Sequence, residues 1–144
     1  MSKLIPNTSD GRTFRVAFDP GQSTGMYINS VLADHQWVCT YEWEELVEWA
    51  VENAQESQIW IVEAFNLMPS KTSVKTFSSF PEVEVIGMLR GLAQGFEVPF
   101  VTVSPGVYKP FASNIQVPTE LGKLDRHQQD AYRLYKYAER FLFS

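Results

Sequence analysis

The sequence predicts an α/β fold in which a mixed, five-stranded sheet is flanked by helices. Three short apolar segments, separated only by turns, come first and resemble an antiparallel meander. Helical periodicity then alternates with two further apolar segments, an order typical of parallel strands joined by helices. The length of 144 residues suits one domain with a single core.

The expected strands are short runs of apolar and β-branched residues. The first ends at Asp19-Pro20-Gly21, a tripeptide typical of a tight turn. The next two complete the meander, and the last two belong to the parallel side of the sheet. The five strands are expected at 14–18, 25–32, 36–41, 58–63 and 98–103.

Three segments show the 3.6-residue period of amphipathic helices, at 42–56, 81–96 and 125–142. In the first, glutamates line the face opposite the apolar residues. In the second, glycine recurs every four residues from Gly87 to Gly95, which we expect to clear one face for close approach of another element. The expected core-facing residues are Trp43, Leu46, Val47, Ala50 and Ala54, then Val85, Ile86, Leu89, Leu92 and Phe96, and finally Ala131, Leu134, Ala138, Phe141 and Leu142.

The remaining segments are polar or irregular. Residues 1–13 show no periodicity and are interpreted as a flexible N-terminal tail, so that a single domain would span 14–144. Residues 64–81, rich in Ser, Lys and Phe, are expected to form a mobile loop. A turn or short helix is expected at 104–111, followed by a loop at 112–124.

The composition is that of an ordinary soluble globular protein, with 44% hydrophobic and 20% charged residues. No apolar run approaches the roughly 20 residues needed to cross a bilayer, and the N-terminus lacks the apolar core of a signal peptide. We therefore expect no membrane association. The single cysteine, Cys39, cannot form an internal disulfide, which favours a cytoplasmic location. Because Cys39 lies in an apolar, β-like stretch, we expect a packed rather than a reactive thiol.

The net charge of −5 argues against nucleic-acid binding at first sight, because duplex binding generally uses a basic surface. The charge is unevenly distributed, however. Residues 1–56 carry a net charge of −6, mostly from the predicted helix at 42–56, and residues 57–144 carry +1. A local basic surface could therefore be formed by Lys71, Lys75, Arg90, Lys109, Lys123 and Arg126.

Carboxylates stand at the ends of two buried strands. Asp19 follows the first strand and Glu63 ends the fourth. A charged group in this position lies at the rim of a sheet, where strand ends form clefts, and both would reach the same edge if the strands are parallel neighbours. In the last helix, His127 and Asp130 are three residues apart and extend the core-facing stripe, so both would turn toward the sheet.

Three carboxylates and a histidine at one edge would repel each other unless cations neutralise them. Oxygen-rich sites of this kind suit Mg²⁺, with Mn²⁺ as a substitute. Two such ions, about 4 Å apart, stabilise the attacking and leaving oxygens of an in-line phosphoryl displacement. The pattern therefore predicts hydrolysis of phosphodiester bonds by a metal-activated water, with two ions in the active site.

Each of these residues also has a purely structural interpretation. Asp19-Pro20-Gly21 could be an ordinary turn, and Glu63 could simply open a loop. His127 and Asp130 could be surface residues near a helix start, where Asp also suits the helix dipole. The four residues in this order and in these contexts are more specific than any one of them, which favours the site.

Five short motifs occur along the chain. They are V-A-F-D-P-G-Q-S-T-G at 16–25, I-V-E at 61–63, I-G-M-L-R-G at 86–91, P-G-V-Y-K at 105–109 and H-Q-Q-D-A at 127–131. In the same order they resemble motifs of the RuvC family of Holliday-junction resolvases, in the RNase H-like superfamily. The first family motif is a strand that ends in aspartate-proline-glycine and is followed by threonine-glycine. The second is another strand that ends in an acidic residue. The others are a glycine-x-x-arginine-glycine helix, a proline-x-x-valine-lysine segment and a terminal helix that carries an acidic residue.

The resemblance implies an RNase H-like fold and a homodimer that nicks four-way DNA junctions at two symmetric, metal-dependent sites. Asp19, Glu63 and Asp130 would then be metal ligands. His127 would be a further ligand or would assist the hydrolytic water. Lys109 would contact the scissile phosphate or its neighbour.

The resemblance also implies further contacts with branched DNA. Members of the family place an aromatic residue soon after the second acid to prop open the junction, and Phe65 is the nearest candidate, with Phe77 and Phe80 as weaker ones. Packing in the core is the alternative role for these rings. From the charge distribution, and not from the resemblance, the basic residues expected to contact DNA besides Lys109 are Lys71, Lys75 and Arg90.

The chain departs from the bacterial resolvases in two places. The segment between Lys109 and His127 is shorter and lacks their glycine-rich stretch and intervening helix, and the N-terminal tail is longer. Compact forms of this kind occur in bacteriophages. A phage origin would imply debranching of replicated DNA in the cytoplasm of the infected host, and a cellular origin would imply recombination or repair.

Other functions remain open at this point. A less selective nuclease of the same superfamily would act on flaps, replication forks or RNA–DNA hybrids. A non-catalytic DNA-binding or scaffold relative is a second alternative, although a scaffold has little use for clustered carboxylates. The phosphate-binding half of a sugar-kinase-like fold is disfavoured, because the chain is too short for two lobes.

Overall fold

The structure is a computed structural model that describes residues 12–65 and 80–143. Its five strands form one sheet in the order β3-β2-β1-β4-β5, with β1–β2 and β2–β3 antiparallel and β1–β4 and β4–β5 parallel. The predicted mixed sheet of an antiparallel meander and parallel strands is therefore confirmed. The strands are β1 (Phe14–Asp19), β2 (Ser23–Ser30), β3 (His35–Glu42), β4 (Ser57–Glu63) and β5 (Phe100–Val103).

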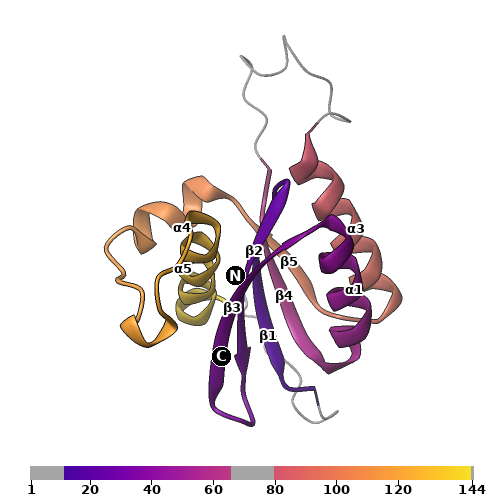
Figure 1. Cartoon of the computed structure of the whole chain (residues 1–144), viewed down its shortest axis with the longest axis horizontal. Helices are drawn as coiled ribbons and strands as arrows, with labels where there is room; N and C mark the ends of the chain where they lie inside the picture. Colours follow the sequence, from indigo (N-terminus) through magenta and orange to yellow (C-terminus); the bar gives the residue numbers. More distant parts are fainter. Residues whose placement is uncertain (1–11, 66–79, 144) are drawn as a thin grey trace.

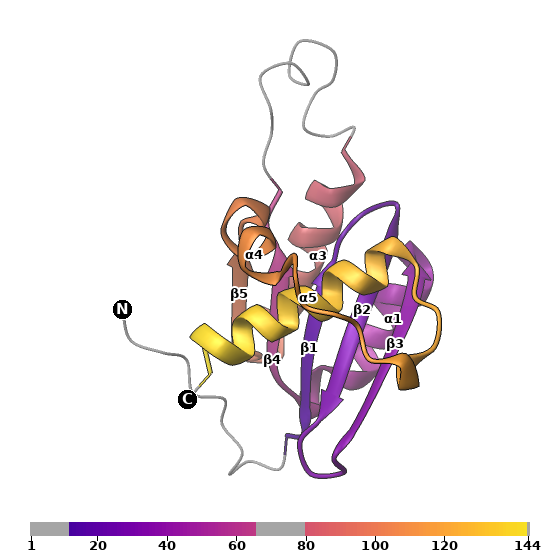
Figure 2. The ribbon, with the colours of Figure 1, turned by 90° about the vertical axis from the view of Figure 1, so that its left-hand side faces the viewer.

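Helices cover both faces of the sheet (Figure 1). On one face lie α1 (Trp43–Asn53) and α3 (Pro81–Gly95), and on the other lie α4 (Pro105–Ala112) and α5 (Arg126–Phe141). Figure 2 shows α5 crossing the sheet obliquely, over the strands of the meander and β4. Two short 3₁₀ helices, η1 (Ala54–Glu56) and η3 (Thr119–Leu121), complete the described elements.

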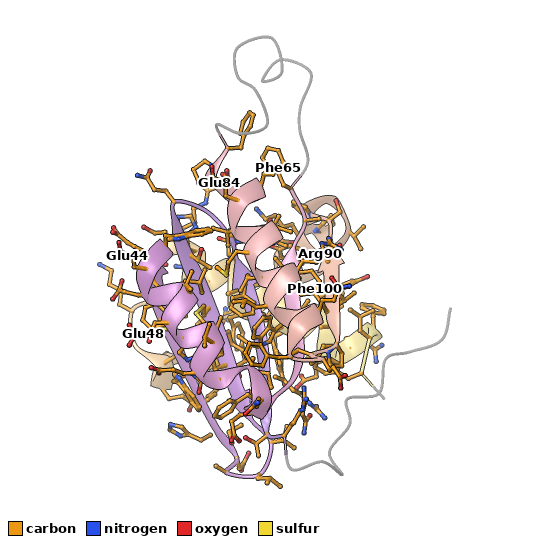
Figure 3. All side chains as sticks on the ribbon, turned by 90° about the vertical axis from the view of Figure 1, so that its right-hand side faces the viewer. Glu44, Glu48, Phe65, Glu84, Arg90 and Phe100 are labelled. Atoms are coloured by element: carbon orange, nitrogen blue, oxygen red, sulfur yellow. The ribbon has the colours of Figure 1, made fainter. Side chains whose placement is uncertain are left out.

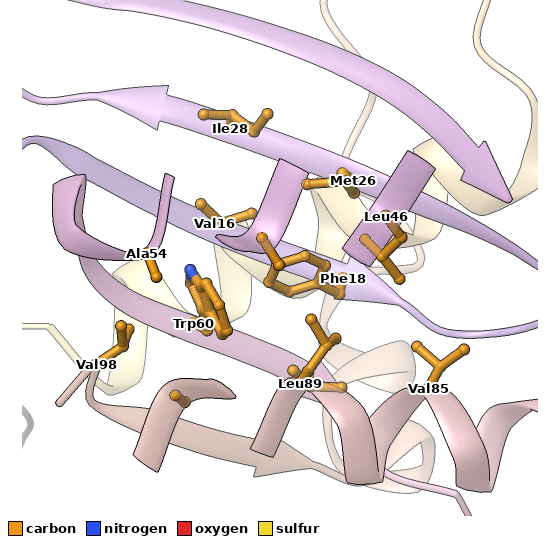
Figure 4. Close-up of a cluster of buried hydrophobic side chains, with 13 residues drawn as sticks. Val16, Phe18, Met26, Ile28, Leu46, Ala54, Trp60, Val85, Leu89 and Val98 are labelled. Atoms are coloured by element: carbon orange, nitrogen blue, oxygen red, sulfur yellow. The ribbon is translucent and has the colours of Figure 1, made fainter. Parts of the chain in front are cut away.

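The alternation of side chains along the strands divides the interior into two apolar layers. Val16 and Phe18 of β1 face α1 and α3, where Trp60 of β4 also packs (Figure 4). Ala17, between them, faces the opposite layer beneath α4 and α5, beside Tyr135. Because both faces are covered, the central strands β1 and β4 carry unbroken apolar runs, at 16–18 and 59–62, instead of alternating with polar residues.

The helices bury somewhat different residues from those expected. In α1, Leu46 and Ala50 are fully buried as predicted, but Trp43 opens the helix and is 44% exposed. Trp49 extends the buried face and makes an edge contact with Phe18. In α5, Ala131, Leu134 and Ala138 are buried as predicted, whereas Phe141, the last residue of the helix, is 45% exposed and Leu142, which follows it, is partly buried.

The expectation that the glycines of α3 clear a face for another element is wrong. A Cβ atom added at Gly87, Gly91 or Gly95 would have nothing within 4 Å among the described residues. The three glycines are exposed, so their four-residue spacing lies on the outer side of the helix and does not reflect close packing within the described part of the chain.

The described residues include two, Arg12 and Thr13, from the segment expected to be a flexible tail. The backbone N–H of Thr13 donates to Glu56 (2.8 Å), and its carbonyl accepts from Val31 (2.9 Å). The guanidinium of Arg12 donates to the carbonyls of Ser57 and Phe96. The rest of the predicted tail, 1–11, lies outside the described residues. No helix in the described ranges is long and apolar enough to span a bilayer.

Replacing Gly87 by Ala tests the assignment of the exposed glycine face. Glycine in a helix interior is less favourable than alanine by roughly 0.5–1 kcal/mol, and the added methyl group meets nothing in the described part of the chain. We therefore expect Gly87→Ala to increase the free energy of unfolding by that amount in urea titrations. A decrease would show that this face is packed against something, such as a second copy of the chain.

Candidate active site

The carboxylates of Asp19 and Glu63 meet at one edge of the sheet because β1 and β4 are parallel neighbours. Phe18 of β1 pairs with Val62 of β4, so the next residue of each strand is the acid. Asp19 is buried and Glu63 nearly so, with side chains 9% and 12% exposed. Both line a cavity of about 390 Å³ at this edge.

The first turn of α5 brings two more residues to the cavity. Asp125 caps the helix, since its carboxylate accepts from the backbone N–H of Gln128 (2.8 Å) and from the hydroxyl of Thr40 on β3 (2.7 Å). The helix therefore begins at a fixed place above the sheet, and His127 and Asp130 both line the cavity.

Close packing against β2 fixes the height of α5 over the sheet. Gly25 is the register partner of Asp19 in the β1–β2 pair. A Cβ atom at Gly25 would lie only 2.4 Å from the backbone carbon and oxygen of His127, which no side chain could tolerate. With glycine there, Nδ1 of His127 lies 2.9 Å from Oδ2 of Asp19.

Lys109 of α4 places a cation beside the carboxylates. Its Nζ lies 3.6 Å from Oε1 of Glu63 and 3.6 Å from Oδ2 of Asp130. The side chain of Lys109 is 44% exposed, so its ammonium group borders solvent at the mouth of the cavity. The structure thus brings together all five residues that the sequence analysis placed in or beside the active site.

The electrostatic environment of the cavity favours added positive charge. The pKa of Asp19 is raised to about 9, first by burial, then by a hydrogen bond and repulsion from Glu63, and then by repulsion from Asp130. Burial, reinforced by the same three carboxylates, also raises the pKa of the Tyr108 hydroxyl, which therefore stays protonated. The ammonium group of Lys109 lowers the pKa of Asp19 without offsetting these effects.

The donor set fits a hard divalent cation in its chemistry, with three carboxylates and an imidazole around one cavity. In the structure, however, these side chains do not form a complete set of metal ligands. Within residues 12–65 and 80–143, no three His, Cys, Asp or Glu side chains are grouped closely enough to hold a metal ion. Instead, the Lys109 ammonium lies close to both Glu63 and Asp130, so a bound cation would require these side chains to move.

Of the other predicted DNA contacts, the structure describes Phe65, Phe80 and Arg90. Phe65 lines the cavity and a neighbouring pocket, with its ring 5.0 Å from that of Phe80, which is buried. Arg90 lines only the neighbouring pocket, and its guanidinium lies 5.1 Å from the Phe100 ring (Figure 3). Lys71, Lys75 and Phe77 lie outside the described residues.

Two residues that line or adjoin the cavity, Glu82 and Tyr108, were not predicted, and Arg126 was expected only as part of a basic surface. Glu82, in the first turn of α3, has one carboxylate oxygen buried without a hydrogen-bond partner among the described residues. Arg126 precedes His127, and the hydroxyl of Tyr108 donates to Oε1 of Glu63 (3.1 Å). Of the two unpredicted residues, only Tyr108 had a sequence signal, because it occupies the position of the valine in the proline-x-x-valine-lysine pattern.

No family model matches the chain, and no curated protein matches it in sequence. Solved structures do match. RuvC from T. thermophilus, in complex with a Holliday-junction substrate, superposes with a TM-score of 0.55 over 90% of this chain and 96% of that one, at 16% sequence identity.

The chain has a RuvC-like fold. The predicted RNase H-like architecture is thereby confirmed: its sheet combines antiparallel and parallel strands and is covered by helices on both faces. At 16% identity the likeness establishes the fold alone, so the chemistry of the RuvC-like domain has to be argued from its own residues.

Replacing Gly25 by Ala tests how tightly the fold fixes the site. The methyl group would overlap the backbone of His127, and overpacking of this kind costs roughly 1–3 kcal/mol or more. We expect Gly25→Ala to lower the free energy of unfolding by about 3 kcal/mol, measured by urea titration. Gly87→Ala is the matched control, with the opposite expected sign. Equal stabilities would contradict the close contact between β2 and α5.

Proposed function

We propose that the protein is a metal-dependent endonuclease that hydrolyses phosphodiester bonds in branched DNA, with four-way junctions as its preferred substrate. The observation that carries this proposal is the convergence of Asp19, Glu63, His127 and Asp130 on one cavity beside Lys109. The RuvC structure with a similar fold, bound to a Holliday-junction substrate, supports the choice of substrate.

In this proposal, Asp19, Glu63 and Asp130 hold Mg²⁺, or Mn²⁺ as a substitute, with two ions per site. When bound, these ions would supply charge neutralisation and activation of a water molecule. Electrostatic stabilisation of this kind is the main requirement of phosphoryl transfer, because negative charge is spread over the phosphate oxygens in the transition state. The raised pKa of Asp19 is compatible with the proposal, since its main cause is burial and the neighbouring carboxylates Glu63 and Asp130 add to it.

His127 and Lys109 would act on the water and the substrate. Nδ1 of His127 is engaged by Asp19, which leaves Nε2 to take a proton from the attacking water or to serve as a further ligand. Lys109, half exposed at the mouth of the cavity, can turn its ammonium group from the carboxylates to a phosphate oxygen of the DNA. Phe65, at the rim, would contact the unpaired centre of the junction.

The same proposal includes a homodimer. Two copies related by a twofold axis would place two cavities on the two opposed strands of a junction, as symmetric cleavage requires. The protein would act in the bacterial cytoplasm, either in recombination and repair or, for a phage protein, in debranching of replicated DNA.

Cleavage of matched DNA substrates tests the substrate class. Purified protein is incubated with Mg²⁺ and a labelled four-way junction, beside a flap, a fork, an RNA–DNA hybrid and a linear duplex of the same sequence. Preferential cutting of the junction is expected. Equal cutting of the other substrates would favour a less selective nuclease. No cleavage of any branched DNA in Mg²⁺ or Mn²⁺ by well-folded protein would refute the proposal.

Asp130→Asn is expected to keep junction binding and abolish cutting. The amide preserves the size of the side chain but removes the charge that would hold the cation, whereas DNA affinity depends mainly on phosphate contacts. Binding is measured by gel shift in Ca²⁺ or EDTA, and cutting is measured in Mg²⁺. The matched control is Glu139→Gln on the same helix, whose carboxylate pairs with Lys136 away from the cavity. Retained cutting by the Asp130→Asn variant would remove Asp130 from the site.

Divalent cations are expected to stabilise the folded protein. A ligand that binds only the native state at about 100 times its Kd adds about 2.7 kcal/mol to the free energy of unfolding. We expect Mg²⁺ and Mn²⁺ to raise Tm by several degrees, reversibly with EDTA, and Asp130→Asn to reduce the gain. A scaffold without a cation site would show no such gain in Tm, even if it bound DNA.

A further inference from the structure

The hydroxyl of Tyr108 is buried against one of the acids of the site. Tyr108 is fully buried, and its O–H donates to Oε1 of Glu63 at 3.1 Å. A phenol usually finds a partner when it is buried, but most partners are carbonyls or water. Here the acceptor is a side chain that lines the acidic cavity.

Local structure explains why Tyr108 reaches Glu63. Glu63 pairs with Val103 at the ends of β4 and β5, so α4 starts directly beside the acid. Ser104 caps α4, since its hydroxyl accepts from the N–H of Gly106 and its carbonyl accepts from the N–H of Tyr108. This one turn of helix brings the Tyr108 ring back over the end of β4.

Two consecutive residues of α4 contact the same carboxylate oxygen. Lys109 Nζ lies 3.6 Å from Oε1 of Glu63, and the Tyr108 hydroxyl lies 3.1 Å from it. Their environments differ, because Lys109 is 44% exposed whereas Tyr108 is fully buried. The ammonium group can therefore leave Glu63 for a phosphate, whereas the hydroxyl is held in place by the core around its ring.

We propose that Tyr108 is a positioning residue that holds the Glu63 carboxylate in its orientation toward the cavity when Lys109 has turned to the DNA. This inference rests on the proposed function, because it assigns to Glu63 the task of holding a cation. Groups that orient a metal ligand typically contribute on the order of 10- to 100-fold to metal affinity or activity.

The test compares two buried tyrosines of the same apolar layer. Tyr108→Phe and Tyr135→Phe each remove one hydroxyl and keep the ring, but the Tyr135 hydroxyl lies beside Arg15 and not at the cavity. For wild type and both variants, three quantities are measured on the full chain: Tm in EDTA, Mn²⁺ affinity by electron paramagnetic resonance, and the dependence of junction cleavage on Mg²⁺ concentration.

Tyr108→Phe is expected to weaken Mn²⁺ binding about tenfold and to shift the Mg²⁺ dependence of cleavage upward by a similar factor. Junction affinity in EDTA should stay within about twofold of wild type, since it depends mainly on phosphate contacts. Tyr135→Phe should change Tm but neither the Mn²⁺ affinity nor the Mg²⁺ dependence. A purely structural role of the Tyr108 hydroxyl would move Tm alone.

A double-mutant cycle measures the energetic coupling between Tyr108 and Glu63. If Tyr108 acts through Glu63, then Tyr108→Phe added to Glu63→Gln should cause no further loss of Mn²⁺ affinity beyond Glu63→Gln alone. Additive losses, or Mn²⁺ affinity in Tyr108→Phe equal to wild type, would overturn the inference and leave the nuclease proposal intact. Absence of Mn²⁺ binding and cleavage in wild type would instead refute the proposed function, and the inference with it.

Discussion

The parallel pairing of β1 with β4 is the constraint on which the site depends. It joins two segments separated in the chain by β2, β3 and α1, and its register brings Asp19 and Glu63 to the same edge. Every other component is placed relative to this edge. The cap of α5 at Asp125 and the close contact at Gly25 set where His127 and Asp130 lie.

Holding these acids together is unfavourable without added positive charge. Asp19 is buried beside Glu63 and Asp130, and its pKa of about 9 expresses the resulting preference for a proton at neutral pH. The rest of the fold must outweigh this repulsion, which two apolar layers on the two sides of the sheet can do. Sites that bind and act on charged ligands commonly hold like charges close together, although this lowers the free energy of unfolding.

Much of the fold and the core of the site could be predicted from the sequence. Asp19, Glu63, His127 and Asp130 were recognisable because each stands at a position whose direction follows from strand or helix periodicity. Lys109 needed the family resemblance as well. Glu82 could not be found in this way, and Arg126 was expected only on a basic surface, because their position at the cavity depends on where α3 and α5 start relative to the sheet. The α3 glycines were misinterpreted because spacing alone cannot distinguish a close contact from an exposed face.

The contact between His127 and Asp19 joins residues 108 positions apart in the chain. Such non-local contacts form slowly, because the intervening chain must be closed before they contribute to stability. During synthesis, β1 and β4 leave the ribosome long before α5, so a nascent chain carries two of the acids but neither His127 nor Asp130. The site is therefore completed only when the last helix docks, and an unfinished or truncated chain would lack it even if its sheet had formed.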